Sequence, residues 1–69
     1  MTLEEYRKEC GWSQNEMARQ AGIDANTLRR ALTGKSISVK TARALAAAIS
    51  RELSQPVRFQ DIEQLNVKL

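Results

Sequence analysis

The sequence predicts an all-α fold, a small bundle of four to five short helices. Gly11, Gly22, Gly34 and Pro56 divide the 69 residues into intervals of about one helix each. Within these intervals apolar residues recur at helical spacing. No alternating pattern typical of a strand is longer than residues 66–69. A chain of this length forms one domain.

The first helix is expected between residues 3 and 10. Thr2 and Glu5 have the spacing of a capping box, in which the hydroxyl and the carboxylate each bind an amide left free at the helix start. Gly11 stands where helices commonly end in a left-handed residue.

The second helix, Gln14–Ala21, repeats this arrangement. Ser13 and Glu16 predict another capping box, and Trp12 and Met17 predict a hydrophobic staple across the helix start.

The third helix is expected from Ala25 to about Thr33, between the N-cap Asp24 and Gly34. A fourth helix starts after the N-cap Ser38. Its apolar stripe consists of Val39, Ala42, Leu45, Ala46, Ile49 and Leu53.

After Pro56 the pattern weakens. Phe59, Ile62 and Leu65 suggest a short fifth helix, and residues 66–69 suit either a short strand or a frayed tail. We therefore divide the chain into a domain at 1–65 and a C-terminal tail at 66–69.

The apolar stripes predict the core. The candidates are Leu3, Tyr6, Trp12, Met17, Ala18, Ala21, Ile23, Leu28, Ala31, Leu32, Leu45, Ile49 and Phe59. Tyr6 and Trp12 would alternatively serve as surface anchors for a partner.

Composition argues against several classes of protein. One cysteine, Cys10, cannot form an intramolecular disulfide, and without histidine it cannot complete a zinc site. The lack of histidine and of a glycine-rich phosphate loop argues against an enzyme, so no cofactor is expected. The longest apolar run, Ala44–Ile49, is too short to span a membrane, and the first residues do not resemble a secretory signal. We expect a soluble, cytoplasmic protein.

The positive charge is concentrated in the middle of the chain. The net charge of +3 divides into −2 for residues 1–28, +6 for 29–58 and −1 for 59–69. Such a block suits a polyanionic partner, although a solvated basic face is the other interpretation.

A short glycine-containing turn, residues 22–24, joins the second and third helices, which is typical of a helix-turn-helix. Ala18 is small enough for a close crossing, and Gly22 adopts a positive φ without a Cβ penalty. Ile23 and Leu28 are expected to fill the crevice between the two helices.

In this stretch the chain resembles the Cro/CI-type (Xre-like) helix-turn-helix repressors. The matching segments are WSQNEMARQAGIDANTLRRALTGK at 12–35 and SVKTARALA at 38–46, and the resemblance covers residues 3–53. It implies a sequence-specific regulator of double-stranded DNA. One position departs from the pattern: several family members pair an arginine in the first helix with a glutamate late in the third, but here Arg7 stands in the first place and Leu32 occupies the second. Arg7 would pair with Glu4 or be free for a phosphate.

The outward side of the third helix carries no carboxylate, whereas solvated faces usually mix in acids. Asparagine suits adenine, arginine suits guanine and alanine suits a thymine methyl in the major groove. The candidate base contacts are Ala25, Asn26, Thr27, Arg29 and Arg30.

Phosphate contacts are expected on either side of this helix. Gln14 begins the second helix, whose N-terminus suits a phosphate, and the resemblance implies the same contact. The other candidates are Lys35, Ser36, Lys40, Thr41 and Arg43. Arg51 and Arg58 would be solubilising charge.

The resemblance further implies a Cro-like repressor, from a phage or mobile element, that occludes a promoter as a homodimer, at least on DNA, with a pseudo-palindromic operator. The apolar residues left for a dimer interface are Phe59, Ile62, Leu65, Val67 and Leu69. An antitoxin-type module that also binds DNA is the alternative. Neither a membrane nor a small-molecule ligand is expected as a partner.

Overall fold

The computed structural model describes residues 1–69 and confirms the all-α class. The helices are α1 (Leu3–Cys10), α2 (Gln14–Ala21), α3 (Ala25–Leu32) and α4 (Val39–Leu53). Two short strands, β1 (Ile37–Ser38) and β2 (Val67–Lys68), and one 3-10 turn, η1 (Phe59–Asp61), complete the chain. The third helix ends one residue earlier than expected, at Leu32, with Thr33 as its C-cap.

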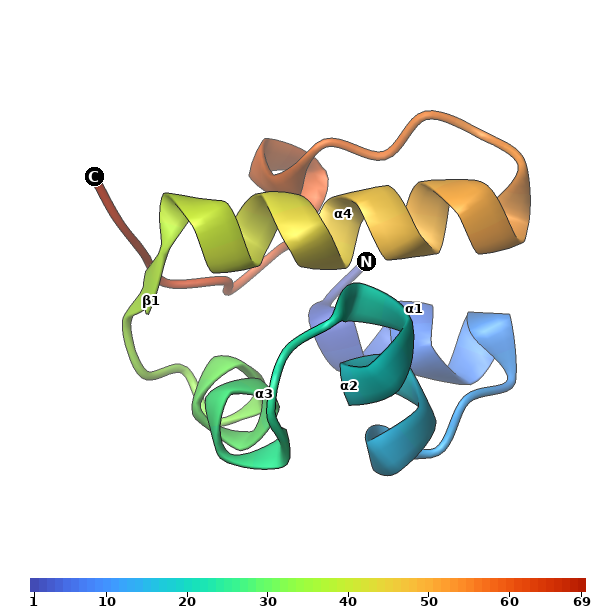
Figure 1. The fold of residues 1–69 in the computed structure, drawn as a ribbon. Coiled ribbons are helices and arrows are strands. Elements are labelled where there is room, and N and C mark those ends of the chain that lie inside the picture. Colours follow the sequence, from blue (N-terminus) through green and yellow to red (C-terminus); the bar gives the residue numbers. More distant parts are fainter.

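The longest helix, α4, lies across α1, α2 and α3 (Figure 1). It contacts α1, α2, both strands and η1. Three of its five buried residues are alanines, Ala42, Ala46 and Ala48, and their small side chains allow neighbouring backbones to approach closely. The helix is therefore the element around which the rest of the chain is packed.

The core consists of 14 buried residues, all of them hydrophobic. Eight were predicted: Leu3, Trp12, Met17, Ala18, Leu28, Ala31, Leu45 and Ile49. Five predicted members are only partly buried against the core: Tyr6, Ala21, Ile23, Leu32 and Phe59. The core members that the prediction omitted are Ile37, Ala42, Ala46, Ala48, Val57 and Ile62. Trp12 is thus a core residue and not a surface anchor.

Only one of the two predicted capping boxes is complete. At α1 the Glu5 amide donates to Thr2 Oγ1 at 3.2 Å, and the Thr2 amide donates to Glu5 Oε1 at 2.8 Å. At α2 the Glu16 amide donates to Ser13 Oγ at 3.1 Å, but the carboxylate does not return the bond. The Glu16 carboxylate accepts from Arg19 and Gln20 instead, because these donors lie on the same helix face three and four residues later.

The turn between α2 and α3 has the predicted geometry. Gly22 lies in the left-handed region at φ 69°, where a Cβ would be strained. The Gly22 amide donates to the carbonyl of Arg19 at 3.1 Å, and the Ile23 amide donates to the carbonyl of Ala18 at 3.0 Å. These bonds close the end of α2, so the chain turns at once into α3.

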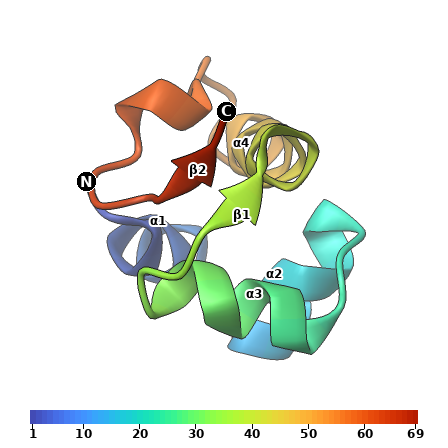
Figure 2. The same cartoon turned by 90° about the vertical axis from the view of Figure 1, so that its left-hand side faces the viewer.

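The predicted fifth helix is wrong: η1 is a single turn that ends at the extended Ile62, Gln64 then turns the chain at φ 63°, and Val67 and Lys68 form β2. The Glu63 amide donates to the Met1 carbonyl at 2.9 Å, and the last residues form β2, which pairs in parallel with β1 (Figure 2). The extended form is favoured because the N-terminus and β1 provide backbone partners while Ile62 is buried. Of the two expectations for the tail, the short strand is confirmed.

The burial of Leu45 gives a stability prediction. Its side chain is fully buried, so Leu45→Ala should lower the free energy of unfolding by about 2–5 kcal/mol. Leu69, which is 98% exposed, provides the matched control, and Leu69→Ala should change the free energy by no more than about 0.5 kcal/mol. Urea unfolding followed by circular dichroism measures both. Equal losses in the two variants would contradict the described core.

Candidate nucleic-acid interface

Helix α3 is anchored on one side and open on the other. Its N-cap carboxylate, Asp24 Oδ1, accepts from the Thr27 amide at 2.6 Å, which lowers the pKa of Asp24 below its usual value. Leu28 and Ala31 are buried against the core. The opposite face of the helix is left to solvent.

The solvent face of α3 brings several predicted base contacts together. Asn26, Arg29, Arg30 and Lys35 are exposed and line one shallow hollow together with Thr33. Arg29 Nη1 donates to Asn26 Oδ1 at 3.1 Å, and Arg30 Nη2 donates to the Ser36 carbonyl at 3.1 Å. The hollow contains no carboxylate, so its guanidinium groups keep donors for a ligand.

The remaining two candidates for base contact lie outside this hollow. Ala25 is exposed at the start of α3, and Thr27 is half-buried. Thr33 was not among the candidates, although the helical spacing places it on the outward side. Its hydroxyl donates to the carbonyls of Arg29 and Arg30, at 2.9 and 3.2 Å, so it caps the end of the helix.

The candidate phosphate contacts differ in how freely they are presented. Those with exposed side chains are Gln14, Lys35, Lys40 and Arg43. None of the three cations takes part in an intramolecular ion pair. Ser36 and Thr41 are half-buried. Thr41 also belongs to the cap of α4: its amide donates to Ser38 Oγ, and its hydroxyl oxygen accepts from Ser38 Oγ, both at 3.1 Å.

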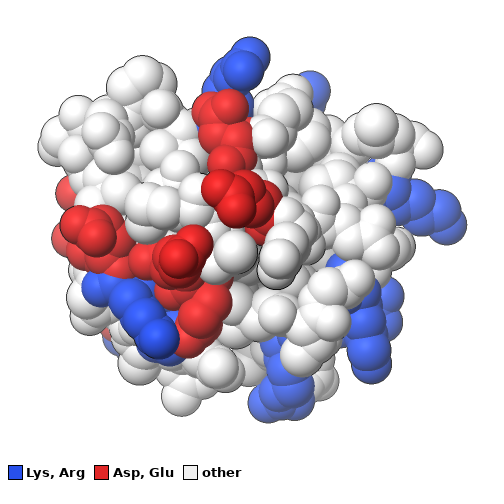
Figure 3. Space-filling model, turned by 180° about the vertical axis from the view of Figure 1, so that it is seen from behind, with Lys and Arg blue, Asp and Glu red and all other residues white.

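The acidic and basic side chains are unevenly distributed over the surface. Figure 3 views the molecule from behind, with the α1 side to the left and the α3 side to the right. Acidic side chains gather in the left half and centre of this face. Basic side chains lie at its right, lower right and upper edge, and some basic atoms also lie among the acidic group on the left. The exposed cations of α3, Arg29 and Arg30, thus lie away from the main group of acidic side chains, an arrangement that suits a polyanionic partner.

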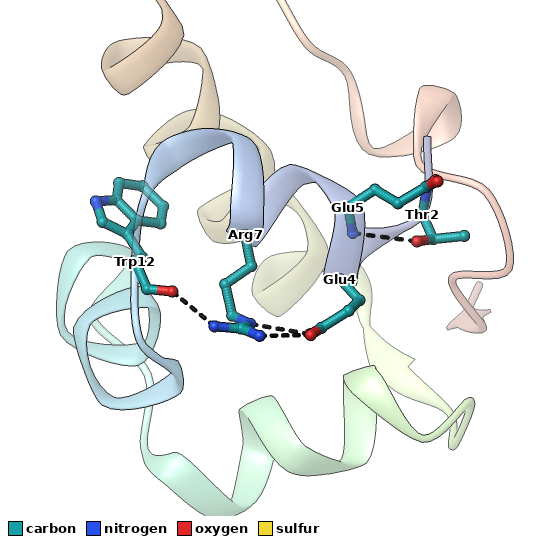
Figure 4. A network of polar contacts seen from close by, with 5 residues as sticks. All are labelled: Thr2, Glu4, Glu5, Arg7 and Trp12. Carbon is teal, nitrogen blue, oxygen red and sulfur yellow. Dashed lines mark hydrogen bonds and ion pairs between the residues drawn. The ribbon is translucent and has the colours of Figure 1, made fainter.

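The structure decides between the two roles considered for Arg7. Its guanidinium bonds both carboxylate oxygens of Glu4 and donates from Nη1 to the Trp12 carbonyl at 2.7 Å (Figure 4). The hydrogen bond between the side chains of Arg7 and Glu4 lowers the pKa of Glu4 and raises the pKa of Arg7. Arg7 is therefore occupied within the chain, and Leu32, which stands at the position where the resemblance implies a glutamate, is half-buried against the core.

Two further residues, Arg51 and Asn66, form hydrogen bonds to the ends of the segments around α3, and no sequence pattern predicts these bonds. Arg51 Nη2 donates to the Gln20 carbonyl at 3.2 Å and so ties α4 to the end of α2, which is more than the solubilising role expected of it. Asn66 Nδ2 donates to the Gly34 carbonyl at 3.3 Å. Both contacts join residues more than 30 positions apart, and no local pattern indicates them.

The residues proposed for a dimer interface are unequally accessible. Ile62 is 4% exposed and belongs to the core, while Phe59, Leu65 and Val67 are half-buried against it. Leu69 alone is almost fully exposed. The side chain of Ile62 is thus not available to a second copy unless the chain rearranges.

The comparisons agree with this geometry. A family model described as helix-turn-helix matches residues 3–55, and the chain therefore belongs to the Cro/CI-type (Xre-like) helix-turn-helix family of DNA-binding regulators. Enzymes are not typical of this family. Searches of the curated proteins and of the solved structures find no match. None of the helices has the length and apolar character needed to cross a membrane.

Proposed function

We propose that this protein is a sequence-specific repressor that reads duplex DNA with α3 and occludes a promoter as a homodimer. The observation that carries the proposal is the exposed face of α3, where Asn26, Arg29 and Arg30 line a hollow that contains no carboxylate. An eight-residue helix fits the major groove, and these side chains match the donor and acceptor pattern of base edges.

Each side chain has a defined role in this proposal. The Asn26 amide pairs with an adenine and the Arg30 guanidinium with a guanine, each through two hydrogen bonds. Arg29 reads a neighbouring base pair. Ala25 and Thr27, at the start of the helix, contact a thymine methyl or a base edge.

Phosphates on either side of the groove position α3. Gln14 presents its amide and the free N–H groups of the α2 N-terminus to one phosphate. The other phosphate contacts follow α3 in the chain: Lys35, Ser36, Lys40, Thr41 and Arg43. They fix the register of the protein on DNA but carry no sequence information.

Two considerations support a dimer. One eight-residue helix reads only a few base pairs, which rarely identifies one site in a genome. In addition, β2 belongs to a two-stranded sheet, so one of its edges has no strand partner, and the exposed Leu69 follows it. A second copy can add its own β2 to this edge. Phe59, Leu65 and Val67 then lie beside the contact, and Ile62 supports it from the core.

Selection of bound sequences from a random duplex library tests the proposal as a whole. A repressor of this kind should select two inverted half-sites whose centres are separated by about 34 Å, one helical turn. A single short half-site would retain base reading but contradict the dimer. No enrichment of any sequence would contradict the proposed function.

The base-reading role of Arg30 gives a prediction on specificity. Arg30→Ala should weaken binding to the selected site by about 1–3 kcal/mol and relax the preference at one base pair. Arg58→Ala, which removes the same charge from an exposed arginine outside α3, is the control and should leave the preference intact. Binding to selected and random duplexes is compared by fluorescence anisotropy. Equal losses on both duplexes would show that Arg30 contacts only the backbone.

The phosphate role of Lys40 gives a prediction on salt dependence. Lys40→Ala should weaken binding to all duplexes and flatten the slope of log K against log salt by about one unit. Lys8→Ala, on the acidic α1 side, provides a control with the same change in net charge. Titrations between low and moderate salt measure the slope. An unchanged slope for Lys40→Ala would remove this residue from the phosphate contacts.

A further inference from the structure

The linker between α3 and α4 bears directly on the proposed DNA surface. It runs from Gly34, which has φ 81°, to Ile37 in β1. Its Lys35 lines the α3 hollow, and its Ser36 carbonyl accepts the bond from Arg30 Nη2 at 3.1 Å. The conformation of the linker therefore sets where Lys35 stands and which direction the Arg30 guanidinium takes.

A single residue of the C-terminal segment holds both ends of this linker. Asn66 Nδ2 donates to the Gly34 carbonyl at 3.3 Å, and the Asn66 carbonyl accepts from the Ile37 amide at 2.9 Å. The next two residues, Val67 and Lys68, continue the contact as β2, which pairs in register with β1 (Figure 2). Residues 34 and 37 are thus bound to one point on a segment that follows them by about 30 residues.

We propose that Asn66 is a positioning residue for DNA recognition, and that the C-terminal strand clamps the linker so that Arg30 and Lys35 are presented in their binding geometry. The proposal rests on the proposed function of the α3 face. A free linker must lose its conformational freedom when DNA binds, whereas a clamped linker has already lost it, so affinity increases.

The clamp and the dimer contact use different parts of the same strand. The clamp uses the edge of β2 that faces β1, whereas a second copy would add to the other edge. A duplex with a single half-site therefore isolates the clamp, because one protomer binding alone gains nothing from a dimer.

The first measurement needs no DNA. In Asn66→Ala the bond to Gly34 is lost, and we expect exchange of the Ile37 amide with solvent deuterium to quicken about three- to tenfold. Amides of α2 should be unchanged. Gln60→Ala is the matched control, since Gln60 is an exposed carboxamide of the same segment without a side-chain hydrogen bond. Unchanged exchange at Ile37 would overturn the clamp.

The second measurement tests positioning through Arg30. On a duplex with one selected half-site, Asn66→Ala should bind about three- to tenfold more weakly than the wild type. The melting temperature of the protein should change by no more than a few degrees. In the background of Arg30→Ala the same substitution should cost clearly less, because the side chain that it orients is gone. Equal losses in both backgrounds would assign Asn66 a merely structural role and overturn the proposal.

The exchange measurement and the binding measurement together distinguish a failure of this inference from a failure of the proposed function. If the wild-type protein shows no sequence preference, the proposed function fails while the exchange result still reports on the linker. If the wild type binds specifically and Asn66→Ala binds equally well, only the clamp fails. Removal of residues 66–69 is the stronger second variant, and it should release the Ile37 amide further while circular dichroism remains helical.

Discussion

Burial of the apolar face of α4 is the constraint on which the rest of the structure depends. The chain has no disulfide and no buried polar or charged residue, so its cohesion comes from 14 hydrophobic residues. Five of them lie on α4, and this helix contacts α1, α2, η1 and both strands. Its alanines allow those elements to approach closely, and Leu45 and Ile49 fill the centre. A 69-residue domain has a small free energy of unfolding, so the apolar face of α4 tolerates few substitutions.

Helix α3, which carries the proposed DNA-binding surface, is left free on one side by this arrangement. It buries only Leu28 and Ala31 completely, and it is held by α1, α2 and β1. The anchored side fixes its position while the other side keeps its amide and guanidinium groups exposed. Rigid support behind an exposed polar face is what a site for specific recognition needs, because ordering the side chains at the moment of binding weakens affinity.

The pairing of Arg7 in α1 differs from the pairing that the resemblance implies. The resemblance implies an ion pair between the first and third helices, but Arg7 bonds Glu4 on its own helix and the carbonyl of Trp12, just before α2. Leu32 replaces the charged partner with apolar contact against the core. The hydrogen bond from Arg7 thus leads toward α2, while α1 and α3 are in contact through packing. Arg7 is consequently occupied within the chain, and the cations proposed to contact DNA begin with Arg29.

The sequence by itself determined the four main helices, because capping residues, glycines and apolar spacing act within a few positions. It likewise determined the turn at Gly22 and the outward set Asn26, Arg29 and Arg30, which follow from the helical period. Only the tertiary structure decided the course of the chain after Pro56. There the apolar spacing favoured a helix, but backbone partners on the N-terminus and on β1 stabilise an extended chain. The bond from Asn66 to the linker depends on that path, and contacts between residues so distant in sequence leave no local pattern.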